Sequence, residues 1–202
     1  MLVAGRLVMR HIVFALALTM TLMSAAVAGP FEDGMAAHDR GDYATALRLW
    51  RPLAEQGNAP TQYNLGLMYS SGQGVPQDYA EAIKWCRLAA EQGSANAQYV
   101  LGIMYANGRG VPQDYAEAMK WCRLAVEQGY ARAQYMLGIM YANGRGVPQN
   151  DVQAHMWFNL AASRAPASER DIAFELRNAV ASEMTPAQIA EAQKLAREWK
   201  PK

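Results

Sequence analysis

The chain has 202 residues and is nearly neutral, with 19 basic and 18 acidic residues, and 51% of its residues are hydrophobic. This balance, without a cluster of lysines and arginines, gives no support for binding to nucleic acid or to an acidic membrane surface. The length suffices for one domain with a sizeable core, and no low-complexity linker divides the chain.

The first 28 residues have the pattern of a secretory signal peptide. A basic stretch with Arg6 and Arg10 precedes an apolar run over residues 12–23, and Ala26-Val27-Ala28 follows. A transmembrane anchor is the alternative, but the run is well short of the roughly 20 residues that a bilayer requires. Met9 is an alternative initiator. We expect cleavage after Ala28, which leaves a soluble periplasmic or secreted protein without a stable membrane anchor, and with 17 basic against 18 acidic residues.

The short pattern Leu-Gly-x-Met-Tyr recurs at a fixed interval in the middle of the chain. It occurs at 65–69, 101–105 and 137–141, each time 36 residues after the last. Self-similarity with a period of 20 to 50 residues is typical of solenoid proteins, in which each helical pair buries its apolar side against its neighbours. The sequence therefore predicts an all-α fold, a right-handed α-solenoid of helix-turn-helix repeats.

Residues 95–129 illustrate one unit, with a helix A over 95–107 and a helix B over 115–128. Between them, Gly108 permits a positive φ and Pro112 cannot continue helix A. Asp114 and Glu117 form the D-x-x-E pattern that opens helix B. The unit is therefore predicted to be a helical hairpin with a glycine-rich turn.

Helical periodicity predicts which residues form the core. In helix A these are Ala97, Gln98, Leu101, Met104, Tyr105 and Gly108, and Gly102 beside them lets helix B approach closely. In helix B, Ala118, Trp121, Leu124 and Ala125 share the core side, and charged residues face water. Position 119 is predicted to face outward, so the equivalent His155 is expected to be a surface residue.

The run Leu-Gly-x-Met-Tyr-x-x-Gly-x-Gly-Val-Pro-Gln-Asp-Tyr-x-x-Ala-x-x-Trp at 65–85 and 101–121 resembles the Sel1-like repeat, a longer relative of the tetratricopeptide repeat. A first unit, with Gly41 and Ala46, is spaced like an ordinary tetratricopeptide repeat. The array over 29–165 is thus expected to hold one tetratricopeptide-like and three Sel1-like units. Segments 97–114 and 133–150 differ at only two positions, which indicates a recent internal duplication.

Residues 166–202 are expected to cap the array. Ser168 can open a helix that runs through Val180, and Thr185-Pro186 can open a second one. The second helix has one apolar stripe: Ile189, Ala192, Leu195 and Trp199. A solenoid requires such a terminal element with a polar outer side.

The sequence offers little with which to build a catalytic, metal or cofactor site. None of the three histidines belongs to an H-E-x-x-H motif or to a Cys/His pattern with zinc spacing. Some secreted relatives in the resembled family are described as penicillin-binding or β-lactamase-like, but no serine here begins an S-x-x-K motif. Those relatives also pair two cysteines per repeat, whereas Cys86 and Cys122 lie 36 residues apart and are expected to stay unpaired. We expect a protein that is not an enzyme and carries no metal and no cofactor.

The resulting hypothesis is a monomeric scaffold that binds a protein or peptide through the concave face of its A helices, with no nucleic acid partner. Aromatic and aliphatic residues flanked by asparagine are suitable contact residues, although packing between neighbouring helices also explains them. The candidates are Tyr63, Leu67, Asn96, Tyr99, Ile103, Asn107, Arg132, Tyr135, Ile139 and Asn143. The alternative is non-catalytic binding of a cell-envelope glycan such as peptidoglycan, with the same tyrosines stacking on sugars.

Overall fold

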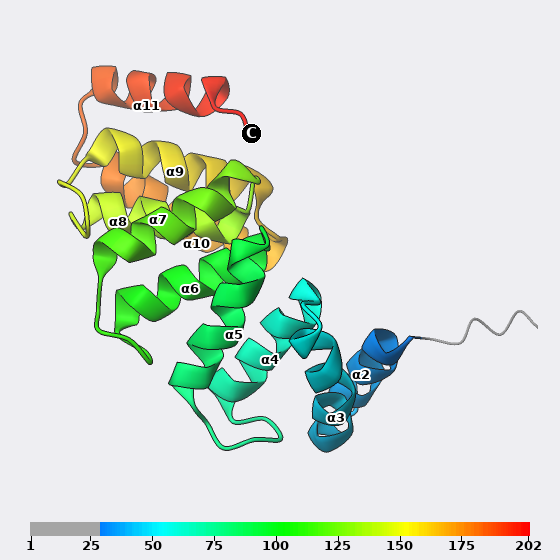
Figure 1. The fold of residues 1–202 in the computed structure, drawn as a ribbon. Helices are drawn as coiled ribbons and strands as arrows, with labels where there is room; N and C mark the ends of the chain where they lie inside the picture. The colour runs from blue at the N-terminus through cyan, green and yellow to red at the C-terminus, as the bar shows by residue number, and fades with distance from the viewer. Residues whose placement is uncertain (1–28) are drawn as a thin grey trace, which may run out of the picture.

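The computed structural model describes residues 29–202, and the expected signal peptide, residues 1–28, lies outside this part. All regular secondary structure in the described part is helical, which confirms the all-α prediction (Figure 1). The helices are α2 (Pro30–Asp39), α3 (Tyr43–Glu55), α4 (Ala59–Ser71), α5 (Tyr79–Glu91), α6 (Ala95–Asn107), α7 (Tyr115–Glu127), α8 (Ala131–Ala142), α9 (Asp151–Arg164), α10 (Ala167–Ala181) and α11 (Pro186–Glu198). No helix of residues 29–202 has both the length and the apolar character to cross a membrane.

Helices α2 to α9 form hairpins that follow one another along a stack (Figure 1). We call α2, α4, α6 and α8 the A helices, and α3, α5, α7 and α9 the B helices. Each B helix packs on the A helix of its own hairpin and, as far as α7, also on the A helix of the next one. Every hairpin therefore depends on its neighbours, as a solenoid requires.

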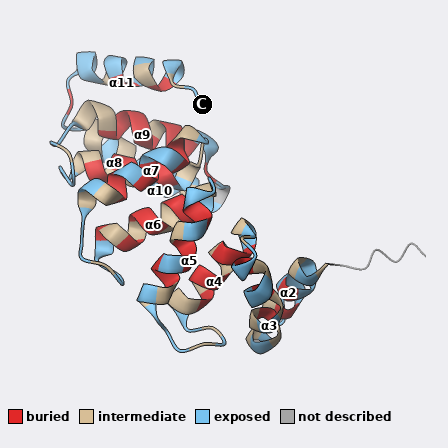
Figure 2. Cartoon of the chain, viewed as in Figure 1, coloured by how far each residue is buried: buried red, intermediate tan, exposed pale blue. Residues whose placement is uncertain are grey.

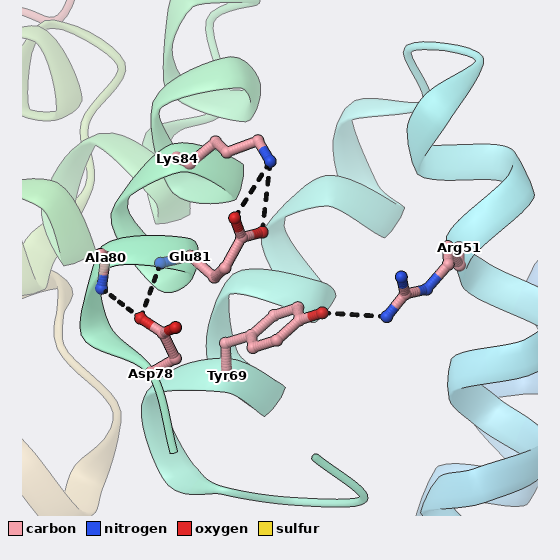
Figure 3. Close-up of polar contacts among 6 residues, drawn as sticks. All are labelled: Arg51, Tyr69, Asp78, Ala80, Glu81 and Lys84. Atoms are coloured by element: carbon pink, nitrogen blue, oxygen red, sulfur yellow. Dashed lines mark hydrogen bonds and ion pairs between the residues drawn. The ribbon is translucent and has the colours of Figure 1, made fainter. Parts of the chain in front are cut away.

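The turn between α4 and α5 shows how the sequence ends one helix and begins the next. Gly72 caps α4 with a φ of 73°, a conformation that costs glycine little. The Asp78 carboxylate then accepts hydrogen bonds from the backbone N–H groups of Ala80 and Glu81, at 2.8 and 3.1 Å (Figure 3). Glu81 also pairs with Lys84 on the exposed surface. Half of the predicted capping pattern is thus present: Asp78 caps the helix, but its own N–H donates to the Tyr69 carbonyl and not to Glu81.

A repeated polar contact ties successive hairpins together. The Arg51 guanidinium of α3 donates a hydrogen bond of 2.9 Å to the Tyr69 hydroxyl of α4 (Figure 3). The same contact joins α5 to α6 and α7 to α8, through Arg87 with Tyr105 at 2.5 Å and Arg123 with Tyr141 at 3.1 Å. These tyrosines therefore have a structural role.

Two predictions about the B helices are wrong, for one physical reason. Leu124 is 38% exposed, whereas Met119 and the equivalent His155 are each 3% exposed. A B helix lies between two A helices, so it buries two sides, and Met119 packs in a cluster with Leu137 of the next hairpin. Burial and the nearby Arg177 lower the pKa of His155.

Both helices that are predicted after the array are present, but the first one begins at a different residue than predicted. Helix α10 begins at Ala167 with Pro166 as its N-cap residue, and Ser168 is exposed inside the first turn rather than capping it. Thr185 caps α11 as predicted, with a reciprocal contact to Gln188. Helix α11 packs on α9 and is exposed along most of its outer surface (Figure 2).

Candidate binding face

Helices α4, α6 and α8 each place a tyrosine at the same repeat position. Tyr63, Tyr99 and Tyr135 are half-buried and lie 36 residues apart. Helices α4 and α6 contain no charged residue, and α8 contains only Arg132. We call the surface around these tyrosines the A-helix face. It is aromatic and almost uncharged.

The hydroxyl groups distinguish these tyrosines from most others in the protein. Six of the ten tyrosine hydroxyls accept a side-chain hydrogen bond, namely those of Tyr43, Tyr69, Tyr79, Tyr105, Tyr115 and Tyr141. Within residues 29–202, the hydroxyls of Tyr63, Tyr99 and Tyr135 make no such bond, and each remains available to another molecule or to water. Structural tyrosines and candidate binding tyrosines are therefore separated by their hydrogen bonding.

An ion pair links this face to α10. The Nε atom of Arg132 lies 2.9 and 3.1 Å from the two carboxylate oxygens of Glu169. Arg132 lowers the pKa of Glu169, and Glu169 in turn raises the pKa of Arg132. Because 51% of the Arg132 side chain and 33% of the Glu169 side chain are exposed, we expect the pair to contribute about 1 kcal/mol or less to stability. It leaves the face with no net charge.

Tyr130 brings the tyrosines of different units together. Its ring centroid lies 5.4 Å from that of Tyr99. Burial, followed by Tyr130, raises the pKa of Tyr99 to about 12, and the same two causes raise the pKa of Tyr63. Tyr130 thus affects the phenols of two preceding A helices. Both phenols stay protonated at neutral pH and can donate hydrogen bonds.

A pocket of about 330 Å³ opens beside this cluster. Its walls come from α6, α8, the end of α9 and α10. The lining residues are Tyr99, Ala131, Arg132, Tyr135, Ala161, Ala165, Glu169, Ile172 and Ala173. Small methyl groups and aromatic rings dominate the walls, and the only charges are those of the ion pair.

Comparison with protein families assigns the repeats. The model of the Sel1 repeat matches residues 31–58, 59–94, 95–130 and 131–165. The chain belongs to the Sel1 repeat family. The match includes the first unit, whose shorter turn is spaced like a tetratricopeptide repeat. Sel1 repeat proteins generally mediate protein–protein interactions.

Solved Sel1 repeat structures share this fold. A Sel1 repeat protein from Oxalobacter formigenes is 31% identical, with a TM-score of 0.66 over 73% of this chain and 57% of that one. The protein c5321, a protective antigen present in uropathogenic Escherichia coli strains, is 30% identical, with a TM-score of 0.57 over 76% of this chain and 40% of that one. This chain therefore spans 57% and 40% of the length of these relatives. No curated protein sequence matches it.

The Sel1 repeats bring some of the expected contact residues together and leave others apart. Tyr99, Arg132 and Tyr135 line the pocket, and Tyr63 lies near Tyr130. The remaining candidates lie elsewhere on the A helices: Leu67, Ile103 and Ile139 are half-buried, and Asn96, Asn107 and Asn143 are exposed. One N–H of the exposed Asn143 amide donates to the Ile139 carbonyl of α8.

Sequence reasoning missed the contribution of Tyr130 and of α10. Tyr130 occupies the N-cap position of α8, where Asn58 and Ser94 cap the equivalent helices, and this departure from the repeat was a usable signal. Glu169 and Ile172 follow the last Sel1 repeat, where no periodicity relates them to the A helices.

The Sel1 array also holds both cysteines of the chain. Cys86 and Cys122 are free and buried, and burial raises the pKa of each thiol to about 12. The thiols are therefore protonated and unreactive at neutral pH. Among residues 29–202, no three His, Cys, Asp or Glu side chains are grouped as a metal site would need.

Proposed function

We propose that the protein is a non-catalytic scaffold of the periplasm or the extracellular space, and that it binds a protein partner on its A-helix face. The location is supported by the basic start, the short apolar run and the Ala-Val-Ala ending of residues 1–28. The non-catalytic role is supported by the pocket lining, in which Glu169 is the only carboxylate and is held by Arg132.

The free hydroxyls of Tyr63, Tyr99 and Tyr135 carry the proposal. These rings are half-buried, so a partner meets them already ordered, and their hydroxyls can bond to a polypeptide backbone. If the three tyrosines only packed between neighbouring helices, we would expect their hydroxyls to accept hydrogen bonds from arginine or glutamine, as most of the other tyrosine hydroxyls do.

The test removes only hydroxyl groups. We expect the double variant Tyr99→Phe and Tyr135→Phe to keep its melting temperature and to lose affinity for its partner, by about 0.5–1.5 kcal/mol for each hydroxyl. The partner is captured from a periplasmic extract, identified by mass spectrometry of the protein and glycan fractions, and then titrated against both forms.

The matched control is the double variant Tyr105→Phe and Tyr141→Phe, whose hydroxyls accept bonds from Arg87 and Arg123. It should melt at a lower temperature yet bind normally per folded molecule. Equal affinity of the first double variant and the unmodified protein would mean that the A-helix face is the wrong face. Capture of a glycan without a protein would favour the alternative of glycan binding.

A further inference from the structure

We propose that the pocket between α8 and α10 is the specificity site of this face, and that it accepts one large, uncharged apolar side chain of an extended polypeptide. This inference rests on the proposed function, because it states what the A-helix face selects.

The lining suits an apolar side chain. Ala131, Ala161, Ala165 and Ala173 present methyl groups, and Tyr99 and Tyr135 present aromatic rings. Ile172 belongs to the same lining and is 50% exposed, the highest exposure among the large hydrophobic residues of the described part of the chain. An apolar group in the pocket would cover Ile172 and remove its surface from water, which is favourable.

The size limits the occupant to about one side chain. An apolar cavity of about 150 Å³ holds a benzene molecule, and pockets for small ligands span about 300–1,000 Å³, so the present pocket is at the lower end of that range. The present volume of about 330 Å³ therefore admits a leucine, methionine or phenylalanine side chain together with the adjoining backbone. It is too small for several large residues at once.

The charges exclude a charged occupant. Arg132 and Glu169 already neutralise each other at the edge of the pocket. Helices α4 and α6, along which the rest of the segment would lie, have no charged residue. A charged side chain in this place would lose hydration without gaining a free opposite charge, which is costly. The complementary partner is thus uncharged over the length of the face.

The free hydroxyls favour an extended backbone. Tyr63 precedes the pocket along the stack and Tyr99 lines it, and the hydroxyls of both have no partner within residues 29–202. In a bound helix, most backbone N–H and C=O groups are already paired with each other, whereas an extended segment leaves them available. A bound extended segment can therefore place its apolar side chain in the pocket and its backbone against these tyrosines.

The probe for the test is a library of random linear peptides displayed on phage and selected on the protein. We expect selected peptides to share one large apolar residue with uncharged neighbours. The selected peptide is then synthesised, and its affinity is measured for the unmodified protein and for the variants Ile172→Glu and Ile172→Lys. Each variant puts a charge at the pocket and should weaken binding by about tenfold or more. Two opposite charges are used so that a simple electrostatic effect of one sign cannot explain both losses.

The matched control is Leu124→Glu, because Leu124 is 38% exposed and lies outside the pocket lining. This control should bind as the unmodified protein does, and replacing the apolar residue of the peptide by serine should cost about tenfold. Selection of charged peptides, failure to select any peptide, or binding by both Ile172 variants as tight as that of the unmodified protein would overturn the inference. If the Ile172 variants bind normally while Tyr99→Phe and Tyr135→Phe weaken binding, the proposed function stands and only the pocket assignment fails.

Discussion

A glycine in each A helix lets a larger residue of the B helix approach its backbone. A Cβ atom added at Gly102 would lie 2.5 Å from Cys122 Sγ, and one added at Gly138 would lie 2.6 Å from the Phe158 ring. Gly66 faces Cys86 in the same way, and Gly34 faces Trp50. The B-helix residues that face these glycines follow one another at intervals of 36 positions. Their side-chain volume varies from unit to unit, whereas the glycine is the same in each.

We predict that Gly102→Ala lowers the free energy of unfolding by about 1–3 kcal/mol, because the added methyl group overpacks the contact with Cys122. Adding Cys122→Ala should restore part of this loss, since the smaller side chain makes room. Urea denaturation of both single variants and the double variant measures the coupling. Strict additivity of the two losses would show that the close approach is not at this pair.

The close approach at Gly102 was predictable from the sequence, but the burial of His155 was not. A glycine inside an otherwise regular helix, flanked by core residues, indicates close packing. His155 is polar, and its burial depends on α9 lying between other helices. A single helical wheel assumes one buried side and therefore places this histidine on the surface.

Buried glutamines join the end of α3 to α4 and the end of α5 to α6. The Gln62 amide donates to the Ala54 carbonyl at 3.0 Å, and Gln98 donates to Ala90 at 3.1 Å. Gln92 and Gln128 then bond to these two amides. Gln134 is fully buried at the equivalent position, but neither polar atom of its side chain has a partner.

The contact around Gln134 differs because Arg164 stands at the repeat position of Gln92 and Gln128. Its guanidinium lies 4.5 Å from the centre of the Trp199 ring, where it packs on the end of α11 rather than on Gln134. An unpaired buried amide is costly, whereas an apolar side chain of similar size is not.

We therefore predict opposite results for one substitution at two equivalent positions. Gln98→Met should lower the free energy of unfolding by about 1–3 kcal/mol, since it removes the hydrogen bond to the Ala90 carbonyl and the one from the Gln128 amide. Gln134→Met should be neutral or stabilising. Thermal and urea unfolding of the two variants supplies the comparison, and an equal loss at both positions would mean that Gln134 is satisfied, for example by a buried water.

At the level of elements, the bounds of the repeat helices followed from sequence, and the pocket did not. Gly108, Asp114 and Glu117 mark helix ends by local chemistry, so α6 has its predicted bounds and α7 ends one residue early. The pocket requires α10 to lie near α8, and this placement depends on long-range packing. The start of α10 was also misplaced, because a helix can begin without a side-chain cap.

At the scale of the whole molecule, the apolar side of the last hairpin has to be covered by a capping element. Met156, Trp157 and Leu160 of α9 are nearly buried in a cluster that includes Ala192 and Ala196 of α11. The rings of Trp157 and Trp199 are 5.9 Å apart and nearly perpendicular. Helix α11 thus covers an apolar surface that a further repeat would otherwise cover.

Removal of residues 186–202 should expose this surface. We predict a loss of about 3 kcal/mol or more in the free energy of unfolding, together with self-association, because several large side chains of α9 lose their cover. The control is removal of residues 200–202 alone, which deletes the exposed pair of Lys202 with Glu127. Since exposed pairs contribute about 0–1 kcal/mol, this shorter deletion should have little effect. Urea denaturation and size-exclusion chromatography of both deletions decide the matter: a monomer of normal stability after the longer deletion would show that the array ends without help from α11.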